Sequence, residues 1–180
     1  IPSVLVTHDI AHYHFPEQVG FLVRKYYEFF ISKFHHKASQ IVAVSEFTKQ
    51  DIVKAYGINA DKISVACNGC RERFQPLSEI EKTSIKNKYA KGEDYFFYVG
   101  AIHPRKNVVR LIAAFDEFKT VTNAPLKLLL AGRMAWQIGE VNEVLQKITC
   151  REDVIFLGYL DTEELPKVTG AAFASTYVSL

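Results

Sequence analysis

The sequence has 180 residues, 48% hydrophobic and 23% charged, and this composition excludes a disordered chain because enough apolar surface is available for a core. Its 22 basic and 20 acidic side chains leave a net charge of +2, which is too small for nucleic-acid binding driven by bulk charge. No apolar run approaches the roughly 18 residues of a membrane span, and three cysteines do not make a disulfide framework, so we expect a reducing, cytoplasmic compartment.

The first part of the chain alternates strand and helix patterns. Short apolar runs predict strands at 4–7, 41–44 and 63–66, and helical spacing of large apolar residues predicts a helix over 21–37. A second helix is expected to begin after Ser45, whose side chain can cap it, and to end at Gly57. We expect Phe47 and Ile52 of this second helix to face the core.

The second part of the chain repeats the alternation after a break. Asn68-Gly69 and Pro76 predict irregular structure, and we assign 1–70 to a first domain, 71–82 to a linker and 83–180 to a second domain. Strands are predicted at 95–99, 126–131, 154–157 and from 171 onward. Helices are predicted at about 80–89, 108–118, 138–148 and 162–168.

Repeated strand–helix units of this length predict an α/β fold with parallel, doubly wound sheets and helices on both faces. Because the chain begins and ends in apolar, strand-like segments, we expect an internal piece of a longer protein, with both domains incomplete. Ligands of such sheets bind at the carboxyl ends of the strands. The residues at these positions are His8, Asp9, Ser45, Glu46, Gly100 to Asn107, Gly132, Arg133, Gly158 and Tyr159.

The loop from Gly100 to Asn107 carries the clearest chemical signal. Gly100 allows close approach of a ligand to the backbone, and Arg105 and Lys106 stand directly before a predicted helix. The free amides at a helix start favour anions, and the two cations add to that attraction. The loop is therefore a candidate diphosphate site, although solvated loop charges are an equally good interpretation from the residues alone.

Two other clusters allow weaker interpretations. His8 could donate a hydrogen bond or act as a general acid or base, and together with Asp9, His12 and His14 it could suggest a metal site, although no metal-binding signature is present. Cys67 and Cys70 form a CxxC over a turn, where a redox or metal role is disfavoured. Cys150 is expected to be a buried or partly buried thiol.

The helix predicted at 21–37 is rich in aromatic and basic residues. Its large apolar side chains include Leu22, Tyr26, Phe29, Phe30 and Phe34, and its cations are Arg24, Lys25, Lys33 and Lys37. Such a helix can lie on a membrane surface. We favour the alternative that the aromatic side chains pack on the sheet while the cations face water.

Several segments, in order along nearly the whole chain, resemble retaining glycosyltransferases of family 4, which have the GT-B fold of two Rossmann-like domains. The segments are Val6 to Asp9, Ile41 to Thr48, Ile63 to Val65, Asn68-Gly69, Phe74 to Pro76, Tyr98 to Asn107, Leu129 to Gly132 and Val154 to Tyr159. The resemblance implies an acceptor-binding first domain and a second domain that binds a nucleotide diphosphate sugar.

The resemblance also implies roles for individual residues. His8 matches the histidine that contacts the transferred sugar, and Lys106 matches the lysine that binds the donor diphosphate. Ala101 stands where the family usually has an arginine, whose charge Arg105 could supply. Gly132 and Arg133 match the lining of the donor cleft, and Gly158 and Tyr159 match positions near the nucleotide base. Asp9, Gly100 and Asn107 complete the expected substrate-binding set.

The resemblance implies transfer of a hexose, mannose or glucose, with retention, from the nucleotide sugar to a glycan or lipid-linked acceptor in polysaccharide biosynthesis. No metal or other cofactor is expected, and the proline-arginine-lysine-asparagine loop favours mannose. The family's glycine-rich N-terminal loop is absent, and its E-x7-E motif is expected after Leu180, so this piece alone is expected to be inactive. The alternatives are a non-catalytic interaction domain of this fold and another GT-B enzyme, such as a sugar-nucleotide epimerase.

Overall fold

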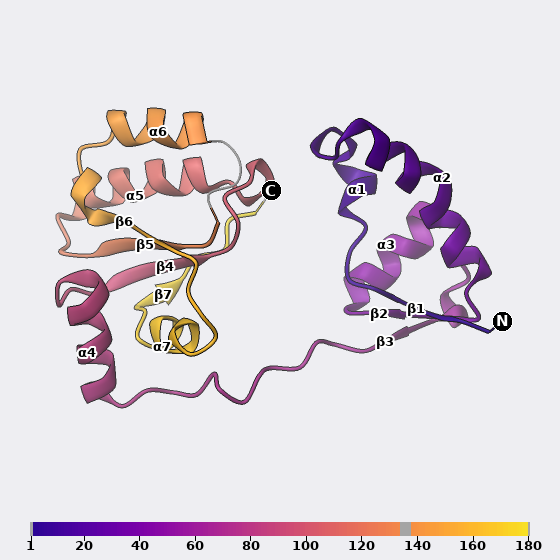
Figure 1. Ribbon diagram of the computed structural model, residues 1–180, viewed down its shortest axis with the longest axis horizontal. Coiled ribbons are helices and arrows are strands. Elements are labelled where there is room, and N and C mark those ends of the chain that lie inside the picture. The colour runs from indigo at the N-terminus through magenta and orange to yellow at the C-terminus, as the bar shows by residue number, and fades with distance from the viewer. Residues whose placement is uncertain (1, 134–137, 180) are drawn as a thin grey trace. The chain divides into compact units, whose positions relative to one another are not determined.

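The computed structural model describes residues 2–133 and 138–179. The chain divides into two compact units, Ile1–Cys70 and Arg71–Leu180, and each unit contains its own parallel sheet. Figure 1 labels the helices and strands of both units.

The first unit is built on three parallel strands in the order β1-β2-β3. They are β1 (Val4–Thr7), β2 (Gln40–Ala43) and β3 (Ile63–Val65), with Leu5 opposite Ile41 and Ile41 opposite Ile63. The helices are α1 (Ala11–His14), α2 (Phe21–Lys37) and α3 (Glu46–Tyr56), with 3-10 turns at Pro16–Gln18 and Ala60–Lys62.

Helix α3 has the termini that the sequence predicts. The Ser45 hydroxyl accepts a hydrogen bond from the Thr48 amide at 3.1 Å, and Gly57 ends the helix in the left-handed conformation with φ of 66°. Ile52 on this helix is buried against Ile41 and Ile63 of the sheet. The strand order and the right-handed crossovers place α2 and α3 on the same side of β1, β2 and β3 (Figure 1).

One expectation for the first unit is wrong, and one face of its sheet is uncovered within residues 2–70. Helices α2 and α3 lie over one face of the three strands, and Val4 and Val6 on the other face are 65% and 55% exposed. Phe47, expected in the core, is 78% exposed. It lies in the first turn of α3, before the stretch that contacts the sheet through Ile52.

The packing expected for α2 is also wrong. Phe29, Phe30 and Phe34 are exposed, and His35 is the buried residue of this helix in the described part of the chain. His35 can occupy a core position because its ring nitrogens meet the Thr7 hydroxyl at 3.0 Å and the Ile31 carbonyl oxygen at 2.8 Å. With Ile31 and His35 facing the sheet, the phenylalanine rings project outward.

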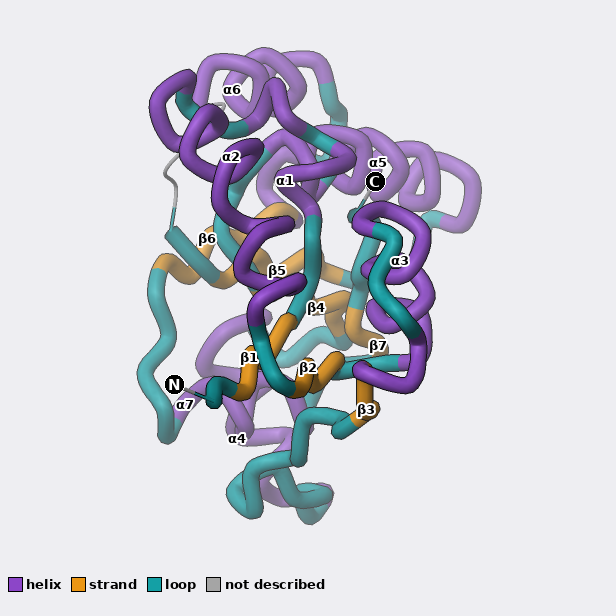
Figure 2. Tube along the Cα trace, turned by 90° about the vertical axis from the view of Figure 1, so that its right-hand side faces the viewer, coloured by secondary structure: helices purple, strands orange, loops and turns teal. Residues whose placement is uncertain are grey.

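The second unit contains four parallel strands in the order β6-β5-β4-β7. The strands are β4 (Tyr95–Val99), β5 (Lys127–Ala131), β6 (Val154–Gly158) and β7 (Ala174–Ser175), and the helices are α4 (Glu79–Ala90), α5 (Val108–Thr122), α6 (Ile138–Lys147) and α7 (Glu164–Gly170). Short 3-10 turns lie at Pro104–Lys106 and Arg151–Asp153. Helices α5 and α6 cover one face and α4 and α7 the other, as the doubly wound prediction requires (Figures 1 and 2).

Local contacts set two boundaries that differ from the sequence prediction. Helix α4 begins inside the stretch 71–82 assigned to a linker, because Ser78 and Glu81 form a reciprocal capping box. The strand expected from Ala171 onward is limited to Ala174–Ser175, because the Ala171 and Ala172 amides still donate to the last turn of α7, at 3.0 and 3.3 Å.

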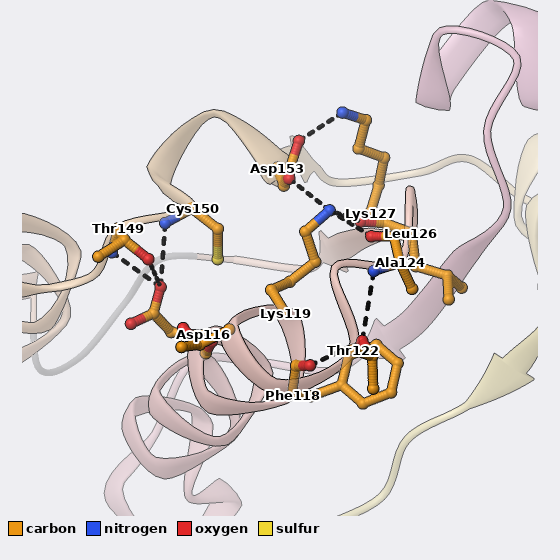
Figure 3. Close-up of polar contacts among 11 residues, drawn as sticks. Asp116, Phe118, Lys119, Thr122, Ala124, Leu126, Lys127, Thr149, Cys150 and Asp153 are labelled. Carbon is orange, nitrogen blue, oxygen red and sulfur yellow. Dashed lines mark hydrogen bonds and ion pairs between the residues drawn. The ribbon is translucent and has the colours of Figure 1, made fainter.

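The amino-terminal edge of the second sheet is held by a polar network (Figure 3). The Asp153 carboxylate accepts from the ammonium groups of Lys119, at 2.8 Å, and Lys127. Burial disfavours its charged form, but these two lysines outweigh that effect and lower the pKa of Asp153. Asp116 of α5 accepts from the Cys150 amide at 2.9 Å, and burial raises the pKa of the Cys150 thiol to about 11. This partly buried thiol agrees with the expectation for Cys150.

Candidate functional site

A cavity of about 340 Å³ lies at the carboxyl ends of β4, β5 and β6 in the second unit. We call it the strand-end cavity. Its lining comes from three parts of the second unit. Helix α7 contributes Leu165 and Pro166, and the segment before α4 contributes Arg71, Arg73 and Phe74. The strand ends and the loops after them contribute Val99, Gly100, Ala101, Ala131, Gly132, Arg133 and Tyr159 to Thr162. This is the edge at which ligands bind in parallel sheets with helices on both faces.

Close backbone contacts between strand ends form the floor of the strand-end cavity. The Gly100 amide donates to the Ala131 carbonyl at 2.9 Å, and the Gly132 amide donates to the Gly158 carbonyl at 2.7 Å. A Cβ atom on Gly132 would lie 2.0 Å from the Gly100 oxygen, and Gly132 has φ of 139°, so only glycine fits there without moving the backbone. The glycines that follow β4 and β5 therefore let the two loops approach each other closely.

The basic loop, residues 103–107, connects the cavity side of β4 to helix α5. The His103 ring nitrogen Nδ1 accepts from the Arg105 amide at 3.3 Å and begins the 3-10 turn that carries Arg105 and Lys106. Burial, with the nearby charges of Arg105 and Lys106, lowers the pKa of His103. Asn107 takes a left-handed conformation with φ of 57° and directly precedes Val108, the first residue of α5. Both cations therefore lie at the amino terminus of a 15-residue helix, where anions are favoured.

The segment after β7 contacts the basic loop. The Lys106 ammonium donates to the Tyr177 hydroxyl at 2.9 Å and lies 4.7 Å from the centre of the tyrosine ring. The Asn107 side-chain amide donates to the Val178 carbonyl oxygen at 3.2 Å. Strands β4 and β7 flank the point where the strand order of this sheet reverses, which is the usual position of the ligand crevice.

The structure brings most of the predicted second-domain residues to one edge of the sheet. Gly100, Ala101, Gly132, Arg133 and Tyr159 line the strand-end cavity, and Gly158 contacts its floor. Arg105, Lys106 and Asn107 continue from Ala101 along the same loop, outside the cavity lining, and Lys106 and Asn107 contact the segment after β7.

The sequence did not indicate Arg71, Arg73 and Phe74 as site residues. They precede α4 and follow no strand of the second unit. A search for residues directly after strands, where ligands of such sheets bind, therefore could not find them. The Arg73 guanidinium donates to the Thr162 carbonyl at 3.1 Å and pairs with Glu163 at 2.9 Å, which ties this segment to the loop after β6. The family resemblance at 74–76 was the one available signal.

In the first unit, His8 and Asp9 follow β1 and line a separate cavity of about 500 Å³. Asp9 accepts from the Ala11 amide at 3.0 Å and so starts helix α1, and the His8 carbonyl accepts from the Thr48 hydroxyl at 3.3 Å. His12 and His35 also line this cavity. The backbone at His8 is thus fixed by α3.

The histidines after β1 have protein partners. His12 meets the Tyr56 hydroxyl at 3.1 Å, and His14 pairs with Asp51 at 2.9 Å. Burial lowers the pKa of His12 more than Asp9 raises it. Within the described residues, no three histidine, cysteine, aspartate or glutamate side chains are grouped as a metal site would require.

Two further features concern chemistry and membranes. Cys67 and Cys70 both have exposed side chains. Across residues 2–133 and 138–179, no helix has the length and hydrophobicity needed to cross a bilayer.

The comparisons with known proteins agree with this architecture. Residues 1–72 match the family described as Glycosyltransferase Family 4, and residues 79–179 match the family described as Glycosyl transferases group 1. The chain belongs to the group 1 glycosyltransferases.

Curated relatives include bacterial mannosyltransferases. The chain is 27% identical over 183 residues to O-antigen chain mannosyltransferase B of Escherichia coli, covering 98% of this chain and 47% of the relative. It is 26% identical over 179 residues to O-antigen chain mannosyltransferase RfbU of Salmonella typhimurium, covering 99% and 46%. The chain thus spans about half the length of these relatives.

Solved structures of glycosyltransferases share the fold. Anabaena HepE in complex with UDP-glucose aligns with a TM-score of 0.79 at 18% identity, covering 99% of this chain and 47% of that protein. WaaG, a glycosyltransferase involved in lipopolysaccharide biosynthesis, aligns with a TM-score of 0.75 at 16% identity, covering 99% and 51%. The fold is of the GT-B type, as expected from the resemblance in sequence.

Proposed function

We propose that the second unit binds a nucleotide diphosphate sugar and that the enzyme carrying this chain transfers the hexose, with retention, to a glycan or lipid-linked acceptor. The observation that carries the proposal is the strand-end cavity beside the basic loop. Arg71, Arg73 and Arg133 line that cavity together with Asp161, and Arg73 pairs with Glu163. Arg105 and Lys106 add positive charge at the start of α5. A nucleoside diphosphate supplies the matching anion.

The leaving group explains why fixed cations would accelerate such a reaction. The bond between the sugar anomeric carbon and the phosphate oxygen breaks, and its electron pair stays on the diphosphate. The acceptor hydroxyl oxygen bonds to the same carbon, and its proton passes to the departing diphosphate. Lys106, Arg105 and the free amides of α5 would stabilise the charge that develops on the diphosphate. We propose that these groups supply the required positive charge without a metal ion.

The first unit would contribute His8 and Asp9, which line the cavity after β1. We propose that His8 contacts the transferred sugar and that Asp9 holds the loop after β1 in place by accepting from the Ala11 amide. Mannose is our first choice of sugar, because the relatives named above are mannosyltransferases of O-antigen chains. A polysaccharide or its lipid-linked precursor is then the proposed acceptor.

The test is the Lys106→Met variant, assayed in a complete enzyme that carries this chain, with UDP-, GDP- and ADP-linked glucose and mannose as donors. Turnover should fall by about 10² or more, because one preorganised donor to the developing charge is lost. Lys147→Met is the matched control, because Lys147 is an exposed lysine on α6 away from the site. Equal turnover of the Lys106 variant and the wild type would refute the assignment.

We also propose that α2 contacts the surface of an anionic bilayer. Phe29, Phe30 and Phe34 are 58%, 38% and 42% exposed, and Lys33 lies 3.1 Å from the centre of the Phe29 ring. Lys33 and Lys37 lie on the same side of the helix as these rings, so this face combines aromatic rings and cations, the composition expected of a helix lying in a membrane interface. Arg24 and Lys25 pair with Glu28 instead. The free, exposed thiol of Cys67 fits the cytoplasmic side of such a membrane, where thiols stay reduced.

Sedimentation with lipid vesicles tests this contact. The wild-type chain should sediment with phosphatidylglycerol vesicles more than with phosphatidylcholine vesicles, and a Phe29→Ser/Phe30→Ser double variant should remain in solution. Phe47→Ser is the control, because Phe47 is a phenylalanine of the same unit that is even more exposed, at 78%, but lies on α3. Unchanged sedimentation of the double variant would contradict a role for α2.

A further inference from the structure

Tyr177 and the basic loop follow two neighbouring strands, β7 and β4, which lie on either side of the point where the strand order reverses. Tyr177 follows β7, whereas Lys106 follows β4, and β4 and β7 are hydrogen-bonded neighbours. The backbone before Tyr177 is fixed, since the Thr176 amide and hydroxyl both donate to the Phe97 carbonyl, at 2.8 and 3.2 Å. The Tyr177 side chain, at 74% exposed, still reaches the Lys106 ammonium.

We propose that Tyr177 is a positioning residue of the donor site: it holds the Lys106 ammonium in place across the crevice between β4 and β7, ready to bind the diphosphate of the donor. The inference rests on the proposed function, since it assumes that Lys106 binds the diphosphate. Tyr177 belongs to neither the basic loop nor the lining of the strand-end cavity, so the proposed function gives it no role.

The geometry supports this role through two different contacts on one lysine. The phenol oxygen accepts a hydrogen bond at 2.9 Å, and the ring lies 4.7 Å from the same nitrogen. The hydrogen bond from Lys106 also lowers the pKa of Tyr177, which agrees with an electrostatic attraction between the two groups. The adjacent contact from Asn107 to the Val178 carbonyl, at 3.2 Å, keeps the two segments together.

An ammonium group has three donors, so Lys106 can keep its bond to Tyr177 and direct its remaining donors to phosphate oxygens. A free lysine must lose side-chain freedom on binding an anion, and this loss weakens binding. Holding Lys106 in advance removes part of this cost. Removal of the Tyr177 hydroxyl should therefore weaken nucleoside diphosphate binding by about three- to tenfold.

A double-mutant cycle on the full chain tests the inference, with calorimetric titration of UDP, GDP and ADP as probes. Tyr177→Phe should weaken binding of the best probe three- to tenfold as estimated above. The same change in a Lys106→Met background should have no further effect. Tyr89→Phe is the matched control, because Tyr89 also stands beside a lysine, with Lys88 4.9 Å from its ring centre, but lies on α4 outside the cavity lining.

The outcomes separate the inference from the proposed function. An equal loss from Tyr177→Phe with and without Lys106 would overturn the positioning role. Wild-type affinity of Tyr177→Phe, together with weaker binding of Lys106→Met, would also overturn it and leave the donor site standing. Wild-type affinity of Lys106→Met would remove the proposed donor site and the inference together.

Discussion

Replacing Gly132 by alanine should damage both the stability of the second unit and its binding of a nucleoside diphosphate. The added Cβ would lie 2.0 Å from the Gly100 carbonyl oxygen and 2.6 Å from the carbonyl carbon. Ordinary carbon–oxygen contacts are no shorter than about 3.3 Å. Because the obstacle is backbone, no side-chain rotation relieves it, and the loops after β4 and β5 must move apart.

The cost has two parts. Overpacking of this kind costs about 1–3 kcal/mol, and a positive φ of 139° on a residue with a side chain adds a strain of about 1–3 kcal/mol. Their sum, about 4 kcal/mol, corresponds to a thermal midpoint lower by roughly 10 to 20 °C for a unit of this size. Since the Gly132 and Gly100 loops both line the strand-end cavity, we expect UDP or GDP affinity to fall at least about tenfold.

Thermal unfolding and calorimetric titration of the full chain measure these two effects. Gly139→Ala is the matched control, because Gly139 lies in the first turn of α6 and an added Cβ would meet nothing within 4 Å. That helical substitution should stabilise the protein by up to about 1 kcal/mol and leave the affinity unchanged. A Gly132→Ala chain with the wild-type midpoint and affinity would refute the close approach of the two loops.

Two further predictions concern titratable groups outside the donor site. Asp153→Asn should lower the free energy of unfolding, measured by chemical denaturation, by about 2–3 kcal/mol, because Lys119 and Lys127 would then lie partly buried without their carboxylate. The diphosphate affinity should not change, and an unaltered free energy of unfolding would contradict the prediction. Burial lowers the pKa of His35 below its ordinary 6.5, so the unfolded chain binds more protons as the pH falls. The contribution of neutral His35 to the free energy of unfolding is therefore complete above about pH 6.5 and decreases below it. His35→Gln should make the unfolding free energy depend less on pH between pH 7 and 5. An identical pH dependence in the two proteins would contradict this.

The sequence was sufficient for elements in which local signals and packing agree. The cap at Ser45 and the stop at Gly57 bound α3 as predicted, and the apolar strands pair in parallel as expected. Glycines after β4 and β5 indicated the edge of the sheet at which the loops approach each other. These features depend on residues close together in the chain.

The sequence was insufficient where distant segments decide the structure. Helical spacing alone could not tell that a buried His35, held by Thr7, would turn the phenylalanines of α2 outward. Arg73 reaches the site from the segment before α4, and Tyr177 reaches Lys106 from the end of β7. Each of these contacts joins residues far apart in the chain, so no local pattern predicts them.

The central claim is that the carboxyl edge of the second sheet binds the diphosphate of a nucleotide sugar. The most direct measurement is a nuclear magnetic resonance titration of the isotope-labelled full chain with UDP and GDP. The account predicts saturable shifts of the residues after β4, β5 and β6, of the segment 71–74 and of the segment at Tyr177, with those of the basic loop lost in Lys106→Met. Shifts confined to the first unit, or no saturable shifts with either nucleotide, would contradict it.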